Sequence, residues 1–269
     1  MTRNGSVIDR RALTVSIVAA LAVAVAIPHV VDSRTKAARI EQARQLTITV
    51  QNVLSGGDDD SCAVTSSGHV DCWGIGYYGQ LGNGSHLRSA TPVQVSGLSG
   101  VTQVTNGDSV NCALESNGSV WCWGSGGYGQ LGNDTFTPAA FTPVAVVGIR
   151  DARQVSAGYG FVCALLATGT VDCWGDGYEG QLGNGNSTPQ DKPVPVSGLS
   201  GVKEVASGGY HACALLTVGE VECWGEGSFG QTGAMDGATE LRPVEVSGTS
   251  VMTQIAAGGA HTCGVTSSG

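Results

Sequence analysis

The sequence predicts an all-β fold: a β-propeller whose blades of about 50 residues hold four short strands each, preceded by an N-terminal transmembrane or stalk helix. Three observations lead to this prediction. A cysteine recurs at positions 62, 112, 163, 213 and 263, at intervals of 50, 51, 50 and 50 residues. A second cysteine, ten residues later, opens a Cys-Trp-Gly string in the first four units. An uncharged stretch precedes all the units.

The second unit shows why each blade should have four strands. It holds the short runs Val101–Val104, Asn111–Glu115, Ser119–Trp123 and Pro143–Val147, separated by Gly, Asn, Asp or Pro. Such residues favour turns, and none of the runs has helical periodicity. We therefore place four blades and a truncated fifth in the repeat region 51–269, at residues 51–100, 101–150, 151–200, 201–250 and 251–269.

The repeated string resembles the regulator-of-chromosome-condensation repeat. It reads Cys-Ala-Leu-x3-Gly-x-Val-x-Cys-Trp-Gly, then Gly-x-Gly-x2-Gly-Gln-Leu-Gly-Asn, then Pro-Val, and it covers roughly residues 51–269. The fourth unit departs from it at Gln231-Thr232-Gly233-Ala234. The resemblance implies a β-propeller, often of seven blades, and a differently built outer loop in the fourth unit.

The resemblance implies less about function, because a fold hosts many functions. The family includes a nuclear nucleotide-exchange factor for a small GTPase, a plant photoreceptor and a secreted bacterial inhibitor. Their working residues lie in variable loops, so none is carried over to this chain. We expect a non-enzymatic module of the bacterial exported type that binds an as yet unknown protein, with nucleotide-exchange-type regulation as a weaker alternative.

The cysteine spacing predicts disulfides within each blade. If Ser66-Ser67-Gly68 forms a three-residue hairpin loop, Cys62 and Cys72 lie directly opposite each other on adjacent strands, within disulfide range. The other predicted bonds are Cys112–Cys122, Cys163–Cys173 and Cys213–Cys223, which leaves Cys263 without a partner. Zinc binding and reduced core thiols are the alternatives.

The tryptophans of the repeat have two interpretations. Trp73, Trp123, Trp174 and Trp224 occupy one repeat position, which indicates packing between blades rather than a ligand cage. Trp121 stands where other units carry an acidic residue. It is either an anchor for a protein partner or another residue packed between blades.

No residues suggest catalysis, a cofactor or a metal. The repeat position of His211 and His261 also accepts Asp60, Val110 and Phe161, which indicates a structural role. The chain has no nucleophile motif and no phosphate-binding loop. Residues 58–60 are three consecutive aspartates, which we interpret as a solvated loop, with calcium binding as the alternative.

The N-terminus predicts a membrane-associated segment. Residues 12–31 carry no charge and are long enough to cross a bilayer as a helix, and the basic residues 1–11 before them should stay in the cytoplasm. The repeats would then lie outside the cytoplasm, in the periplasm or at the cell surface, tethered to the membrane or secreted.

Three versions of this segment remain open. The alternatives are an uncleaved signal anchor, a signal peptide cut after Ala26, and a helix similar to those of type IV prepilins and pseudopilins. The third version rests on Ile27-Pro28 and the basic, alanine-rich residues that follow, although the region after Gly5 departs from a prepilin processing site. It would make the chain a structural subunit carrying a propeller head on a stalk helix or linker at residues 32–50.

The charge distribution limits the class of partner. Residues 1–50 hold seven Lys or Arg and three Asp or Glu, whereas residues 51–269 hold six and 19, a net charge of −13 in the repeats. Nucleic-acid binding depends on neutralising phosphates with basic side chains, so nucleic acid is not an expected partner. A protein partner, with or without basic character, is expected instead.

Overall fold

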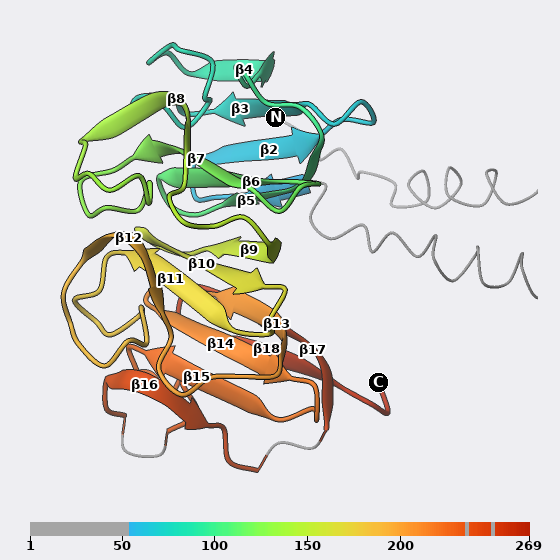
Figure 1. The fold of residues 1–269 in the computed structure, drawn as a ribbon, viewed down its shortest axis with the longest axis vertical. Helices are drawn as coiled ribbons and strands as arrows, with labels where there is room; N and C mark the ends of the chain where they lie inside the picture. Colours follow the sequence, from blue (N-terminus) through green and yellow to red (C-terminus); the bar gives the residue numbers. More distant parts are fainter. Residues whose placement is uncertain (1–53, 235–236, 249–250) are drawn as a thin grey trace, which may run out of the picture. The chain divides into compact units, whose positions relative to one another are not determined.

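The computed structural model describes residues 54–269 apart from 235–236 and 249–250 (Figure 1). The predicted segments 1–11, 12–31 and 32–50 lie outside the described residues. In the described part every regular element is a β-strand, and the strands form four four-stranded antiparallel sheets and one two-stranded sheet, each in sequence order. The prediction of an all-β fold with four-stranded blades is confirmed for these residues.

The strands are grouped into four blades and a partial one. Blade 1 holds β1 (Leu54–Gly56), β2 (Asp60–Val64), β3 (Val70–Gly74) and β4 (Ser89–Gln94). Blade 2 holds β5 (Val101–Asn106), β6 (Val110–Glu115), β7 (Val120–Ser125) and β8 (Ala139–Ala145). Blade 3 holds β9 (Ala152–Ala157), β10 (Phe161–Leu166), β11 (Val171–Gly175) and β12 (Gln190–Pro195). Blade 4 holds β13 (Val202–Ser207), β14 (His211–Leu216), β15 (Val221–Gly225) and β16 (Glu240–Glu245), and the partial blade holds β17 (Met252–Ala257) and β18 (Thr262–Thr266).

The hydrophobic core lies between successive blades. The first strands of the blades contact one another in the order β1, β5, β9, β13, β17, and the sheets lie side by side in sequence order (Figure 1). One cluster joins Val70 and Val95 of blade 1 to Val104 and Trp123 of blade 2. Equivalent clusters join the later blades. Each blade is therefore stabilised by its neighbours, as expected of a repeat protein.

The hairpin predicted from the cysteine spacing has the expected register. Cys62 lies opposite Cys72 and Val64 opposite Val70, while the N–H of Thr65 donates to the carbonyl of His69. Gly68 has a φ of 76°, the left-handed conformation that such a loop needs. These hairpins mark one end of each blade.

The loops at the other end of the blades come together in pairs. The loop between the first and second strands meets the loop between the third and fourth strands, because the chain reverses direction at each strand. The N–H of Ile75 donates to the carbonyl of Asp59 in blade 1 (3.0 Å), and the N–H of Asp176 donates to the carbonyl of Gly160 in blade 3 (2.8 Å). Variable side chains from four blades are thereby displayed at one end.

Candidate binding surface

The four predicted cysteine pairs form disulfides. Each joins the second and third strands of one blade, with Cα–Cα separations of 4.0–4.1 Å, and all eight cysteines are buried: Cys62–Cys72, Cys112–Cys122, Cys163–Cys173 and Cys213–Cys223. The zinc and reduced-thiol alternatives do not apply to this structure. Cys263 is exposed and is the one free cysteine.

The repeat tryptophans lie between blades. The indole N–H of Trp123 donates to the carbonyl of Gln80 (2.7 Å), that of Trp174 to Gln130 (3.0 Å) and that of Trp224 to Gln181 (2.9 Å), always in the preceding blade. These three side chains are fully buried. Trp73 is only half-buried. A role in packing, rather than in a ligand cage, fits this geometry.

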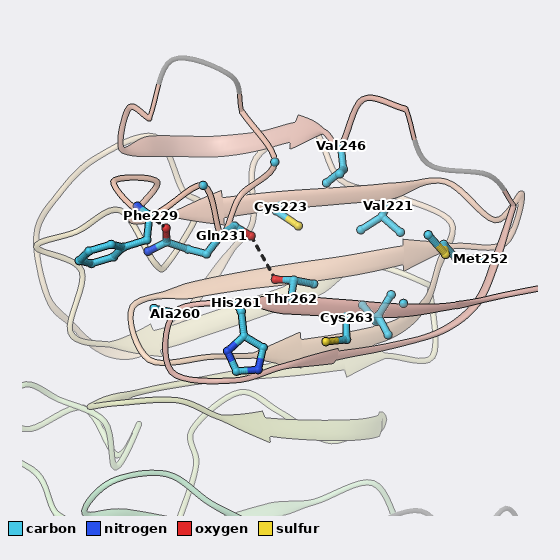
Figure 2. A pocket seen from close by; sticks show the side chains of 14 residues that line it. Val221, Cys223, Phe229, Gln231, Val246, Met252, Ala260, His261, Thr262 and Cys263 are labelled. Carbon is cyan, nitrogen blue, oxygen red and sulfur yellow. Dashed lines mark hydrogen bonds between the residues drawn. The ribbon is translucent and has the colours of Figure 1, made fainter.

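A cavity of about 280 Å³ lies between blade 4 and the partial blade, lined by Gly233, Val246 and Thr262 among others (Figure 2). Its walls match those of the tryptophan sockets. A Cβ on Gly132 would lie 2.7 Å from Nε1 of Trp174, whereas a Cβ on the equivalent Gly233 would meet Val246 at 2.6 Å. The carbonyl of Gln231, which corresponds to the acceptor for an indole, here accepts from the Thr262 hydroxyl (3.1 Å). We therefore interpret this cavity as an inter-blade socket, part of the architecture.

Trp121 lies half-buried against the cluster between blades 1 and 2, against which Val64 and Val93 also pack. Its indole nitrogen is buried without a hydrogen-bond partner. Packing between blades accounts for this position, and its contact with a partner stays a prediction. A separate cavity borders its other side, near Ile149 and Arg150.

The position shared by Asp60 and His211 faces the next blade. Asp60 is part of β2 and only 4% exposed, so the interpretation of residues 58–60 as a solvated loop is wrong for this residue. Its Oδ2 accepts from the amide groups of Asn106 (2.7 Å) and Asn111 (2.6 Å). Burial raises the pKa of Asp60 to about 6.

His211 is fully buried at the equivalent position in blade 4, and its Nε2 lies 2.8 Å from the hydroxyl of Thr262. Burial lowers its pKa to about 4, so the ring is neutral at pH 7. A neutral buried imidazole that hydrogen-bonds the next blade fits the structural role predicted for it.

The described residues contain neither a group of metal ligands nor a membrane-spanning helix. No group of three or more His, Cys, Asp or Glu side chains in this part of the chain could hold a metal ion. Within the same residues, none of the elements is a helix long and apolar enough to cross a membrane.

The surface that stands out is an end of the blades rich in exposed tyrosine, which we call the tyrosine end. It consists of the loops between the first and second strands and the beginnings of the loops between the third and fourth strands. Seven aromatic side chains stand on these loops: Tyr77, Tyr78, Tyr128, Tyr159, Tyr178, Tyr210 and Phe229. Six of them are 41–75% exposed, and Tyr159 is half-buried. Exposed aromatic side chains gathered on one surface are typical of interaction sites.

Four of the tyrosines form two pairs that bridge neighbouring blades. Tyr128 of blade 2 packs edge-on against Tyr178 of blade 3, with ring centroids 6.3 Å apart. Tyr159 of blade 3 packs edge-on against Tyr210 of blade 4 at 5.7 Å. Edge-to-face packing holds each ring in a defined orientation and leaves other ring surface open to solvent.

Carboxylates surround these rings. The hydroxyl of Tyr159 donates to Asp58 of blade 1 (3.1 Å), which raises the pKa of Tyr159. Asp58 and Asp108 are exposed. Partial burial, and after it the charges of Asp58 and Asp59, raise the pKa of Asp108. The tyrosine end therefore has a negative electrostatic potential.

A polar cavity of about 200 Å³ opens at the centre of this end. Glycine-rich loops of five successive blades line it, together with the side chains of Asp58 and Tyr159. Gly57 and Gly158 lack the room for a side chain. A Cβ on Gly57 would lie 2.2 Å from the carbonyl oxygen of Gly107, and a Cβ on Gly158 would lie 2.2 Å from Cε1 of Phe161. Peptide groups of these loops therefore form much of the cavity wall.

This surface was not predicted from the sequence. Its signal is an aromatic residue within the Gly-x-Gly-x2-Gly string of each of the four units, where it looks like part of the repeat motif. The contact between Tyr128 and Tyr178 depends on how neighbouring blades pack against each other, and the repeat period alone does not predict that packing.

The fold and the sockets between its sheets define a β-propeller in which each four-stranded blade contains an internal disulfide. The chain belongs to the regulator of chromosome condensation (RCC1) repeat family, whose model matches residues 67–114, 117–165, 168–215 and 219–265. A second model of the same repeat matches residues 101–130, 152–181 and 202–231.

Individual relatives agree with this assignment. The ultraviolet-B receptor UVR8 of Arabidopsis thaliana is 34% identical over 139 residues, which are 50% of this chain and 32% of UVR8. Human WBSCR16 is 27% identical, with a TM-score of 0.73 over 79% of this chain and 57% of its own. Saccharomyces cerevisiae Prp20p, described with its binding to Gsp1p and histones, is 20% identical with a TM-score of 0.72 over 78% and 54% of the two chains. This chain thus spans only a third to somewhat over half of these proteins.

Proposed function

We propose that this chain is a non-enzymatic, exported β-propeller that binds a protein through its tyrosine end. The observation that carries the proposal is the row of exposed aromatic side chains on loops of four successive blades. Aromatic side chains that leave solvent on binding contribute large apolar area at low cost in conformational entropy, so they are frequent anchors of interfaces. Support for a protein partner also comes from Prp20p, whose described properties include binding to Gsp1p and histones.

The proposed location outside the cytoplasm rests on two independent features. Four disulfides fit an oxidising compartment. Residues 12–31 form an uncharged stretch behind Arg3, Arg10 and Arg11, as in signal anchors and signal peptides. We propose a membrane tether through this segment.

N-terminal sequencing of the mature protein tests the tether. An intact N-terminus in the membrane fraction is expected. Cleavage after Ala26 would replace the tether by secretion. Processing near Gly5 would favour instead the pseudopilin-like structural subunit.

Selection from a library of random displayed peptides tests the binding role. The full chain should retain peptides, and Tyr178→Ala should retain fewer of the same clones. Val218→Ala is the matched control, because Val218 is similarly exposed on a hairpin loop at the opposite end. Clones that bind equally well to wild type and Tyr178→Ala, or a selection without any enriched clone, would contradict the proposed binding surface.

A further inference from the structure

We propose that the tyrosine end recognises a cationic polypeptide segment, whose lysine or arginine side chains lie against the two tyrosine pairs. The inference rests on the binding role proposed above and adds the chemical class of the partner. It depends on three features of this surface: the orientation of the rings, the carboxylates beside them, and the scarcity of basic side chains in the same loops.

The first tyrosine pair lies beside a carboxylate. Asp176 begins the loop that carries Tyr178, and its Oδ1 accepts from the N–H of Tyr178 at 3.1 Å. A Cβ on Gly160 would lie 3.5 Å from Cβ of Asp176 and 3.9 Å from Tyr128, whose ring packs against Tyr178. Asp176 and both rings therefore lie close together. Glu179 is exposed next to Tyr178. A cation over either ring would therefore be attracted both by the ring and by a carboxylate.

The second pair repeats this combination one blade further along. Tyr159 and Tyr210 pack edge-on, and Tyr159 also donates its hydroxyl to Asp58. Tyr159 directly precedes Gly160, which lies next to Tyr128, so the two tyrosine pairs are adjacent. Two neighbouring pairs fit an extended segment with more than one basic residue, rather than a single small cation.

The loops of this end offer little positive charge of their own. Across the described residues of these loops, Arg88 is the one arginine or lysine, and it stands at the far end of its loop, directly before β4. Against it stand the carboxylates of Asp58, Asp59, Asp108, Asp176, Glu179 and Glu226. This balance attracts basic segments and repels acidic ones over about a Debye length.

A buried carboxylate lies below the central cavity. Oδ1 of Asp60 is buried without a hydrogen-bond partner, and it lies 3.1 Å from where a Cβ of Gly57 would be. Gly57 itself lines the cavity. Because it is buried, this carboxylate does not accept a hydrogen bond from a binding partner, but it lies close to the point where the loops of the blades converge.

The test measures binding of three synthetic peptides of equal length to the full chain: alternating lysine and glycine, glutamate and glycine, and serine and glycine. The lysine peptide should bind at least about tenfold more tightly than either of the others at low salt. Its affinity should fall several-fold when NaCl is raised from about 0.05 M to about 0.5 M, since screening weakens exposed charge interactions. Equal binding of the three peptides would overturn the inference.

Single substitutions locate the site. Tyr178→Ala should weaken binding of the lysine peptide by about three- to tenfold, the range for loss of one cation–π contact. Asp108→Asn should weaken it by about two- to threefold without removing a ring, through loss of one partly screened charge. Val218→Ala and Glu220→Gln, at the opposite end, should leave the affinity unchanged. An unchanged affinity for Tyr178→Ala, with intact folding shown by circular dichroism, would contradict the proposed site.

The library selection tests separately whether the tyrosine end binds a protein and whether it prefers cationic segments. If retained clones are enriched in lysine and arginine and depend on Tyr178, both hold. If retained clones depend on Tyr178 but carry no excess of basic residues, the binding role holds and the cationic specificity fails. If no clone depends on Tyr178, the binding role itself fails.

Discussion

The indole N–H of Trp174 donates to the carbonyl of Gln130 across the junction between blades 2 and 3, at 3.0 Å. The same bond recurs at the two neighbouring junctions, and each indole closes a socket formed by a glycine and a valine of the preceding blade. In blades 2, 3 and 4, the tryptophan at the end of the disulfide-linked hairpin therefore joins its blade to the one before it.

Replacing one of these tryptophans should destabilise the propeller. Trp174→Phe should lower the free energy of unfolding by about 2–4 kcal/mol, because it leaves a cavity and an unpaired buried carbonyl. Denaturant unfolding followed by circular dichroism measures the change. Trp73→Phe is the control: Trp73 is half-buried, so a cost below about 1 kcal/mol is expected there. Equal costs at the two positions would contradict the proposed role of the inter-blade socket.

A side-chain amide joins the innermost strands of blades 3 and 4. Gln154 donates to the carbonyl of Val205 (2.9 Å) and accepts from its N–H (2.9 Å). Gln154→Leu should cost about 2–3 kcal/mol of unfolding free energy, since both buried peptide groups lose their partner. Gln254→Leu, at the same repeat position but exposed, should change stability by less than about 0.5 kcal/mol. A similar loss of unfolding free energy in both variants would show that the hydrogen bonds of Gln154 do not cause the destabilisation.

The disulfides should be measurable by thiol counting. Denatured chain without reductant should show one reactive thiol, that of Cys263, and the nine cysteines of the chain should all react after reduction. Removing one bond by the double substitution Cys163→Ala and Cys173→Ala should lower stability by about 2–3 kcal/mol, as for a short closed loop. A count of nine thiols before reduction would contradict the disulfide assignment and, with it, the argument for an oxidising compartment.

Burial of Asp60 predicts a pH-dependent stability. Its pKa of about 6 lies above the ordinary 3.8, so the folded protein holds this proton more tightly than the unfolded chain. The stability that this proton contributes is full below about pH 4 and is lost as the pH rises through about 6, a change of about 3 kcal/mol in the free energy of unfolding. Asp60→Asn should flatten this part of the curve of unfolding free energy against pH. The same slope for Asp60→Asn and wild type would refute this assignment.

The period and hairpin chemistry of the sequence were sufficient to predict the blades and the disulfide register. Spacing of ten residues with a glycine in the loop places Cys62 opposite Cys72, because local turn geometry alone determines that pairing. The repeat position of Trp174 likewise indicated packing between blades, although its acceptor was not predicted.

Contacts between blades were harder to predict, because they join residues about 50 positions apart. Asp60 resembled a member of a solvated acidic loop, yet the amide groups of Asn106 and Asn111 in the next blade make its burial tolerable. The pairing of Tyr159 with Tyr210 and its bond to Asp58 depend in the same way on how successive blades are placed. The candidate site lies in such contacts, so the sequence pattern did not reveal it.

The most direct test of the proposed binding surface is hydrogen–deuterium exchange of the full chain with and without the lysine–glycine peptide. We predict slower exchange in the loops at residues 57–59, 107–109, 126–129, 158–160, 176–180 and 208–210, and no change in the hairpin loops at residues 65–69, 116–119, 167–170 and 217–220. Protection confined to the hairpin loops, or equal protection at both ends, would contradict the assignment of binding to the tyrosine end.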